Sequence, residues 1–170
     1  AELEKIGYEV HYKLIDSSFF NVPQIRRRVF IVGFLKSYFP KNTDFKFPQG
    51  INSKVGIGKF IERHRDGYCI SKKLQKSYIY KFKDKFPEIV DEKSKFQVKT
   101  LVSSYHKIQR ITGTFVKDGK TGLRLLSENE CKAIMGFPKN FSFPVSRTQM
   151  YRQLGNAVVV PVVKEIGKEV

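Results

Sequence analysis

Cysteine is scarce in this sequence, which holds two among its 170 residues. Cys69 and Cys131 are too far apart for a metal pair and form no disulfide framework, so we expect a reducing compartment and a cytoplasmic location. Long apolar runs are also missing, since none approaches the ~20 residues that a membrane span needs. No signal-peptide pattern opens the sequence. The histidines, His11, His64 and His106, show no metal-ligand spacing, so no metal site is predicted.

Acidic residues are few: 16 Asp and Glu stand against 32 Lys and Arg, which gives a formal net charge of +16. Such a surplus favours a polyanionic partner, because binding of phosphates releases their counterions. The 15 Phe and 8 Tyr add side chains that can stack on bases or sugars. The alternative is a basic surface that serves only solubility.

The first 36 residues show a regular pattern. Residues 2–6 resemble the end of an amphipathic helix that Gly7 caps, so we expect the sequence to begin in mid-fold. Residues 8–15 alternate as in a strand. The continuous apolar run at 29–34 predicts a strand buried on both faces.

The middle of the chain, from about 37 to 120, scatters lysines among aromatic residues and is interrupted by Gly, Pro and Asp. This texture predicts a small, loop-rich, mostly β module, with a helix at 58–65 and a strand at 97–102. The last part is more regular. Capping boxes at 127–130 and 146–149 predict helices that end at Gly136 and Gly155, and a third helix is expected from near Ala157 with a proline in its first turn.

Three elements could carry chemistry. The sequence Pro-Gln-Ile-Arg-Arg-Arg at 23–28 places Gln24, Arg26 and Arg28 on one face of an extended segment, where arginine forks suit phosphate or base oxygens. The alternative is a solvent-exposed edge. The apolar strand that follows favours instead a buried arrangement in which these side chains are directed at a ligand. The Gly155-Asn156 pair predicts a sharp turn that presents N–H groups, or else a plain turn between helices.

The third element, residues 124–138, is explained by a capped structural helix alone. Taken together, however, the order and spacing of all three resemble the C-terminal half of bacterial DNA cytosine-5 methyltransferases, over about residues 1–36 and 100–165. The sequence at 143–153 is especially similar to enzymes of restriction–modification systems.

The resemblance implies an enzyme that flips cytosine out of double-stranded DNA and transfers a methyl group from S-adenosylmethionine to its C5 atom, after a cysteine attacks C6. Arg28 then matches the residue that contacts the flipped base, and Arg26 and Gln24 match residues that brace that site. Asn156, Ala157 and Val158 match the cofactor-pocket element. The Thr-Leu pair opens the expected base-reading segment, for which the candidates are Thr100, Leu101, Ser104, Tyr105, Lys107, Gln109 and Arg110.

The implied fold class is α+β: a small, mostly β target-recognition domain flanked by pieces of a Rossmann-like methyltransferase domain. We expect the hairpin part at 1–36, the recognition domain at 37–123, the capped-helix element at 124–150 and the terminal element at 151–170.

The family's glycine-rich loop, its Pro-Cys nucleophile and its Glu-Asn-Val motif all lie N-terminal to the matched region and do not occur here. We therefore expect this chain alone to be inactive, with an incomplete cofactor pocket. It would need an N-terminal methyltransferase half, either as one subunit of a split enzyme or as a fragment, and its exposed apolar faces predict self-association. The alternatives are a non-catalytic DNA-binding module or regulator, and a nonspecific basic RNA binder.

Overall fold

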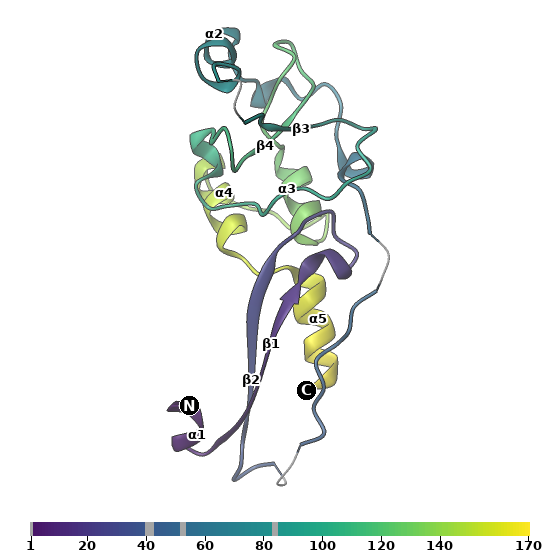
Figure 1. The fold of residues 1–170 in the computed structure, drawn as a ribbon, viewed down its shortest axis with the longest axis vertical. Helices are drawn as coiled ribbons and strands as arrows, with labels where there is room; N and C mark the ends of the chain where they lie inside the picture. Colours follow the sequence, from purple (N-terminus) through teal and green to yellow (C-terminus); the bar gives the residue numbers. More distant parts are fainter. Residues whose placement is uncertain (1, 40–42, 52–53, 83–84) are drawn as a thin grey trace.

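The computed structural model describes residues 2–39, 43–51, 54–82 and 85–170. Figure 1 shows an elongated α+β molecule in which a long β-hairpin and the last helix form the lower half and short elements form the upper half. Buried apolar side chains from both halves, including Val22, Leu101, Ile134 and Val162, form one continuous core. The two halves are therefore packed together rather than joined by a linker.

The hairpin follows from the local sequence. Helix α1 (Glu2–Lys5) ends before Gly7, whose φ of +95° is left-handed, as the predicted cap requires. Strand β1 (Tyr8–Asp16) pairs antiparallel with β2 (Arg27–Leu35) along its full length. Both predicted strands are confirmed.

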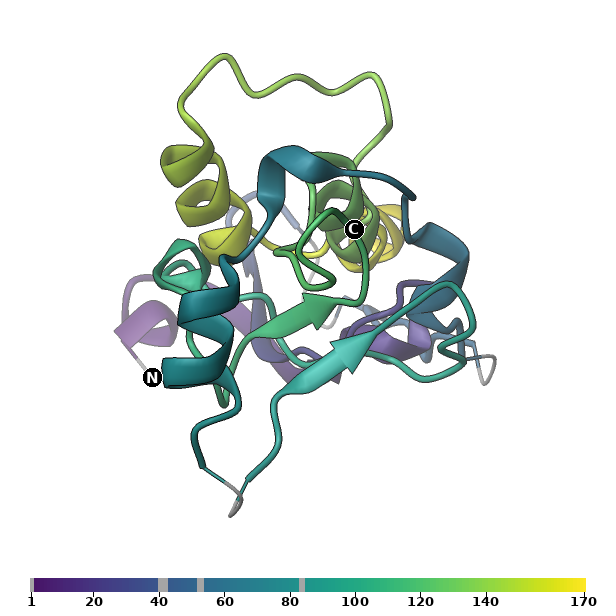
Figure 2. The ribbon, with the colours of Figure 1, turned by 90° about the horizontal axis from the view of Figure 1, so that it is seen from above.

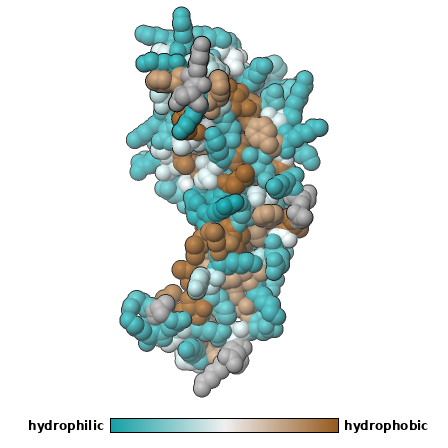
Figure 3. All heavy atoms as spheres, in the orientation of Figure 1, coloured by the Kyte–Doolittle hydropathy of each residue, from teal (hydrophilic) through white to brown (hydrophobic). Residues whose placement is uncertain are grey.

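The expectation that the second strand is buried on both faces is wrong in this structure. Val29 and Ile31 are 60% and 61% exposed, and their cross-strand partners Leu14 and Tyr12 are 60% and 76% exposed. Helix α5 (Val160–Glu169) lies along one side of the hairpin only. The other side leaves this apolar cross-strand group in contact with solvent, and Figure 3 shows apolar residues gathered over the hairpin.

The upper half is not mostly β, which corrects the prediction. In the described part between 43 and 126, the only strands are β3 (Glu88–Val90) and β4 (Thr114–Val116), which pair in parallel over three residues each. The other regular elements there are short helical turns, and loops make up the rest: η2 (Ile57–Phe60), η3 (Asp66–Tyr68), α2 (Lys72–Leu74), η4 (Gln75–Ile79) and η5 (Tyr105–Lys107).

Two of these differences are visible in the backbone. The helix predicted at 58–65 shrinks to η2, because the chain becomes extended at the C-cap Ile61, with a φ of −72° and a ψ of 124°. The strand predicted at 97–102 is reduced to one bridge between Gln24 and Val98. After Val98, the backbone of Lys99 and Leu101 bonds to the side chains of Glu88, Gln24 and Arg26 instead of to a neighbouring strand.

The three terminal helices were predicted well. Helix α3 (Glu128–Met135) has the complete capping box at its start and ends at Gly136 with a φ of +74°. Helix α4 (Arg147–Asn156) starts at the N-cap Ser146, whose hydroxyl accepts a hydrogen bond from the Gln149 N–H group. It ends one residue later than expected.

Helix α5 begins three residues after the expected position and holds Pro161 in its first turn, as predicted. Seen from above, the connection between α3 and α4 arches away from the body (Figure 2). The boundary expected at residue 37 stays a prediction, although residues 43–51 lie along the hairpin (Figure 1). In the part of the chain that the structure describes, no helix is long and apolar enough to cross a membrane.

Replacing Gly136 by alanine should destabilise the fold by about 2–4 kcal/mol, because two costs add. Alanine would be strained in the left-handed conformation, and its Cβ would overpack the site. The new Cβ would lie 2.3 Å from Cδ of Pro161. The control is Gly67→Ala, where nothing lies within 4 Å of the added Cβ, so the change should stay within about 0.5 kcal/mol. Urea unfolding measures both, and equal losses would contradict the packing argument.

Candidate functional site

Gln24 joins the hairpin to both neighbouring elements. Its side chain is fully buried. Nε2 donates hydrogen bonds to the Ile134 carbonyl oxygen at 3.1 Å and to Sδ of Met135 at 3.3 Å, both in α3, while Oε1 accepts from the Leu101 N–H at 2.7 Å. Every hydrogen-bonding group of the amide thus acts inside the protein, so Gln24 is a brace rather than a surface group.

Arg26 makes a second connection from the same segment. Nη1 donates to the carbonyl oxygen of Leu101 at 3.1 Å, and Nη2 donates to those of Gly155 at 3.1 Å and Ala157 at 2.9 Å. Burial, with a smaller effect of the positive charge of Arg28, lowers the pKa of Arg26 to about 10. The guanidinium is still charged at neutral pH, so these are charge-assisted hydrogen bonds.

Arg28 differs from these two residues because its side chain is exposed. Its Nη1 donates to the carbonyl oxygen of Arg27 at 2.7 Å. Together with Phe30, Val158 and Val159 it borders a cleft of about 10 Å³. Arg28 therefore stands at the opening between the hairpin and the last helix, where it can meet a ligand.

The segment that contains Asn156, Ala157 and Val158 follows directly from α4. Asn156 and Val158 are exposed, and Ala157 is half-buried. The predicted sharp turn at Gly155-Asn156 is wrong: both residues are helical, and Ala157 ends the helix with extended backbone at a φ of −67°. Ala157 and Val158 lie beside Arg26 and Arg28 rather than on a separate loop.

Gly155 is required by packing and not by its φ. A Cβ at this position would lie 2.2 Å from the Ser103 nitrogen and 2.3 Å from the Val102 carbonyl carbon. The backbone of α4 therefore rests directly on the segment that follows Thr100. This contact brings two of the sequence elements together without any side chain between them.

Three of the expected base-reading residues are buried inside the protein, which corrects their predicted role. Leu101 is 4% exposed, Tyr105 2% and Arg110 6%. The Tyr105 hydroxyl accepts a hydrogen bond from the Leu126 N–H at 2.9 Å and donates to the Thr114 carbonyl. A side chain with these partners cannot reach a base without breaking them.

Arg110 binds three backbone carbonyl oxygens. Nε donates to Ile79 at 3.0 Å, and Nη2 donates to Phe82 at 2.8 Å and to Lys85. Arg110 thereby anchors the connection between η4 and β3. The surrounding sequence did not predict this structural role.

The other four candidates remain accessible. Lys107 is exposed, while Thr100, Ser104 and Gln109 are partly so. The Thr100 hydroxyl donates to the Ile25 carbonyl oxygen at 2.8 Å, which fixes it against the hairpin. Only this subset is placed to meet a partner.

The structure adds a group that the sequence did not single out. The Arg147 guanidinium lies 5.2 Å from the ring centroid of Tyr68, beside His106, around a cavity of about 220 Å³. Tyr68 and Arg147 are 79 positions apart in the sequence, so no local pattern could reveal the group. In the described residues no cluster of three or more His, Cys, Asp and Glu could hold a metal ion.

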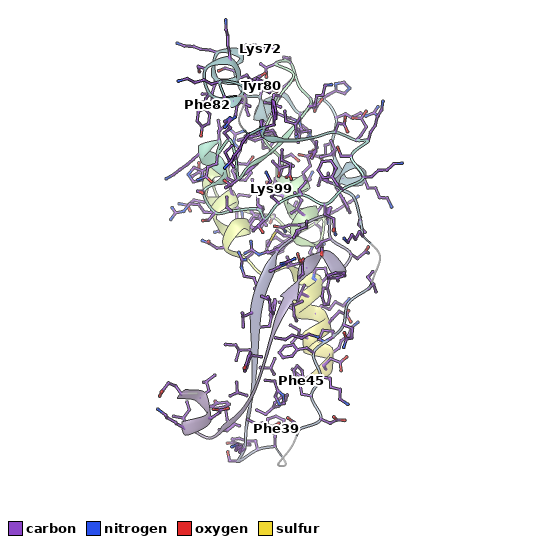
Figure 4. All side chains as sticks on the ribbon, in the orientation of Figure 1. Phe39, Phe45, Lys72, Tyr80, Phe82 and Lys99 are labelled. Carbon is purple, nitrogen blue, oxygen red and sulfur yellow. The ribbon has the colours of Figure 1, made fainter. Side chains whose placement is uncertain are left out.

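A lysine-rich surface occupies the far end of the upper half. Residues 67–82 hold four lysines and no acidic residue. Lys72, Tyr80 and Phe82 lie together at this end (Figure 4), and Nζ of Lys81 is 5.3 Å from the Phe82 ring centroid. Exposed cations interleaved with exposed aromatic rings suit a polyanion that carries bases.

A buried ion cluster organises the element at 124–130. Arg124 is 0% exposed and donates to both carboxylate oxygens of Glu130 at 2.8 Å, to Asp118 at 2.9 Å and to the Glu62 carbonyl oxygen at 2.6 Å. Removing one partner of such a buried cluster leaves an uncompensated charge. This cluster fixes the upper half against the start of α3.

Glu62 belongs to the rim of the same cluster. Burial by itself would raise the pKa of Glu62, but hydrogen bonds from Arg65, Asn129 and Ser127 lower it to about 2. The Asn129 amide donates at 3.0 Å, and the Ser127 hydroxyl also donates to this carboxylate. The folded structure therefore favours the charged form of Glu62.

Comparison with known proteins identifies relatives along the whole chain. The family described as C-5 cytosine-specific DNA methylase matches residues 1–170. The type II methyltransferase M.MspI of Moraxella sp. is 55% identical over 168 residues, which are 99% of this chain and 39% of the relative. M.BsuFI of Bacillus subtilis is 54% identical over 165 residues, 96% of this chain and 40% of its own length. The chain thus spans about two fifths of these relatives.

Two solved structures share the fold. The Entamoeba histolytica methyltransferase EhMeth has a TM-score of 0.74 and 22% identity, over 98% of this chain and 54% of its own. A mutant of Spodoptera frugiperda DNMT2 has a TM-score of 0.75 and 22% identity, over 99% of this chain and 59% of its own.

Lowering the pH should weaken the fold through Glu62. A carboxyl group whose pKa is lower in the folded state stabilises the fold at every pH above its pKa in the unfolded state, which is about 4. This stabilisation is lost as the pH falls through the pKa of the folded state. The free energy of unfolding should therefore fall between about pH 5 and pH 2. Glu62→Gln should show a decline shallower by about 1 kcal/mol, after allowance for partial exposure. Urea titrations across this range test it, and identical pH profiles would contradict it.

Proposed function

The chain belongs to the C-5 cytosine-specific DNA methylases, and from this membership we propose that it forms the DNA-recognition and cofactor-completing part of an enzyme that methylates C5 of cytosine in double-stranded DNA. One observation carries the proposal. Gln24 and Arg26 hold the three sequence elements in one buried network and leave Arg28 exposed beside the Asn156–Val158 segment. That arrangement suits a cationic group facing a flipped base next to one wall of a cofactor pocket.

The residues present fit part of an S-adenosylmethionine site. Asn156 offers an exposed amide at the end of α4, and Val158 an exposed apolar surface next to Arg26 and Arg28. The cleft of about 10 Å³ is far too small to enclose a cofactor, since one water needs about as much. The chain would supply one wall, and a further polypeptide segment the others. When bound, the cofactor supplies the methyl group.

Contacts with duplex DNA would divide into two kinds. The lysine-rich surface at 67–82 would meet phosphates, which position the duplex without reading its sequence. Base contacts would come from Lys107, Gln109 and Ser104, which remain accessible, and from the group around Arg147. Side chains reaching a groove distinguish base pairs by their donor and acceptor patterns.

An N-terminal methyltransferase portion is the partner that we propose for the exposed hairpin face. The apolar group formed by Tyr12, Leu14, Val29 and Ile31 belongs to a sheet of two strands, which a further strand or helix would cover. The nucleophilic cysteine would come from that portion. Without it, the same face would promote self-association of the chain. A split subunit and a piece of a longer enzyme both agree with this proposal.

The second candidate is a non-catalytic, sequence-specific DNA-binding module or regulator. Its support is the Cys131 thiol, which is fully buried and whose pKa burial raises well above the usual value. Such a thiol is a poor nucleophile. Specific DNA binding without methyl transfer in any completed form would favour this candidate.

Methyl transfer in a completed enzyme tests the main proposal. This chain would replace the matching 168 residues of the Moraxella relative, and the product would be assayed for tritium transfer from labelled S-adenosylmethionine to duplex DNA. We expect transfer by the chimera and none by the isolated chain. A folded chimera that binds DNA but never methylates it would count against the enzyme.

Within an active chimera, Arg28→Ala should reduce kcat by at least about 100-fold, the scale for loss of one aimed hydrogen-bond donor. Duplex affinity should change by only a few fold. Arg27→Ala is the matched control, because Arg27 is a neighbouring, 70% exposed arginine that pairs with Asp16. Equal losses of affinity and of kcat in the Arg28 variant would show that it only clamps a phosphate.

A further inference from the structure

The guanidinium of Arg26 lies where two segments with different proposed tasks meet. One is the backbone of 100–103, at the start of the proposed base-reading segment, and the other is the 155–158 segment beside the proposed cofactor wall. Arg26 donates to Leu101 from one terminal nitrogen and to Gly155 and Ala157 from the other. Among the described residues, its buried Nε has no hydrogen-bond partner, and the polar contacts of the side chain run through the two terminal nitrogens.

A second contact joins the same two segments. Gly155 lies so close to Val102 and Ser103 that an added Cβ would come within 2.3 Å of both backbones. At Gly155 the described backbones of the two segments meet directly, so no side chain there can absorb a relative displacement. A shift of the 100–103 backbone must therefore move the end of α4 with it, or break the hydrogen bonds of Arg26.

We propose that Arg26 is a positioning residue that couples DNA binding to cofactor binding. It holds the backbone of 100–103 and the 155–158 segment in one relative arrangement, so that a duplex ordering the first segment also orders the second. Cofactor affinity then rises when DNA is bound, and DNA affinity rises equally when the cofactor is bound, because coupling between two sites is reciprocal. This inference rests on the proposed function.

The chemistry of the side chain supports arginine in particular. Its planar fork presents donors in a fixed geometry, which suits three carbonyl oxygens from two segments. A lysine ammonium is a single point on a flexible chain, so it could reach one segment while releasing the other. The charge is kept at neutral pH, since burial lowers the pKa of Arg26 only to about 10.

The experiment measures a coupling factor in the chimera described above. The dissociation constant of S-adenosylhomocysteine is measured by calorimetry without DNA and with a saturating duplex that the parent chimera methylates. The ratio of the two constants is the coupling factor. We expect about 5–150 for the parent, the usual range for linked sites, and a value within about twofold of one for Arg26→Lys.

Arg110→Lys is the matched control. Arg110 is as buried as Arg26, at 6% against 5%, and also donates to three backbone carbonyls, but all three lie within residues 79–85. It should lower stability to a similar degree and leave the coupling factor at the parent value. A role for Arg26 in stability alone would make the two variants behave alike.

A measurement without any variant guards against misfolding. In the parent chimera without DNA, S-adenosylhomocysteine should slow amide hydrogen exchange at residues 101–105. Three results would each overturn the inference and leave the proposed function standing. They are a coupling factor of one in a parent chimera that methylates DNA, a parent-like coupling factor in Arg26→Lys, and unchanged hydrogen exchange at 101–105. A parent that shows coupling lost in Arg26→Lys but never transfers methyl would overturn the proposed function alone.

Discussion

A buried positive charge that needs acceptors is the constraint on which this structure depends. Arg26 is 5% exposed, and a guanidinium at that depth costs several kcal/mol unless hydrogen bonds replace its water. Its acceptors are carbonyl oxygens of Leu101, Gly155 and Ala157, all more than 70 residues away in sequence. Satisfying one side chain thus requires the hairpin, the upper half and the end of α4 to meet. Gln24 repeats this requirement towards α3.

The sequence predicted best what local chemistry decides. The Gly7 cap, the capping box at Ser127 and the two hairpin strands are set by residues within a few positions of one another, and the structure confirms them. Prediction from the sequence failed where contacts between distant residues decide whether a side chain is exposed. Tyr105 and Arg110 look like exposed polar candidates in a polar segment, yet Thr114 and Ile79 take up their donors. The strand pattern at 97–102 was overridden because its backbone binds the Gln24 and Arg26 side chains.

The candidate site was predictable as a set of elements but not as a geometry. Spacing indicated that residues 23–28 and 152–161 act together, and the structure places them side by side. The spacing did not indicate that the side chains of Gln24 and Arg26 are buried while that of Arg28 is exposed. Nor did it indicate that Gly155 serves a backbone contact, since the same glycine suits a left-handed turn equally well.

The direct contact between α4 and the backbone of 102–103 has a consequence for how such a chain can diversify. The requirement falls on main-chain atoms: a glycine at 155, a carbonyl at 101 and an unhindered peptide between Val102 and Ser103. Side chains before and after that peptide are not bound by it. The segment that we propose reads DNA could therefore change residue by residue, or be exchanged for a longer one, so long as the few peptide units at the junction keep their path.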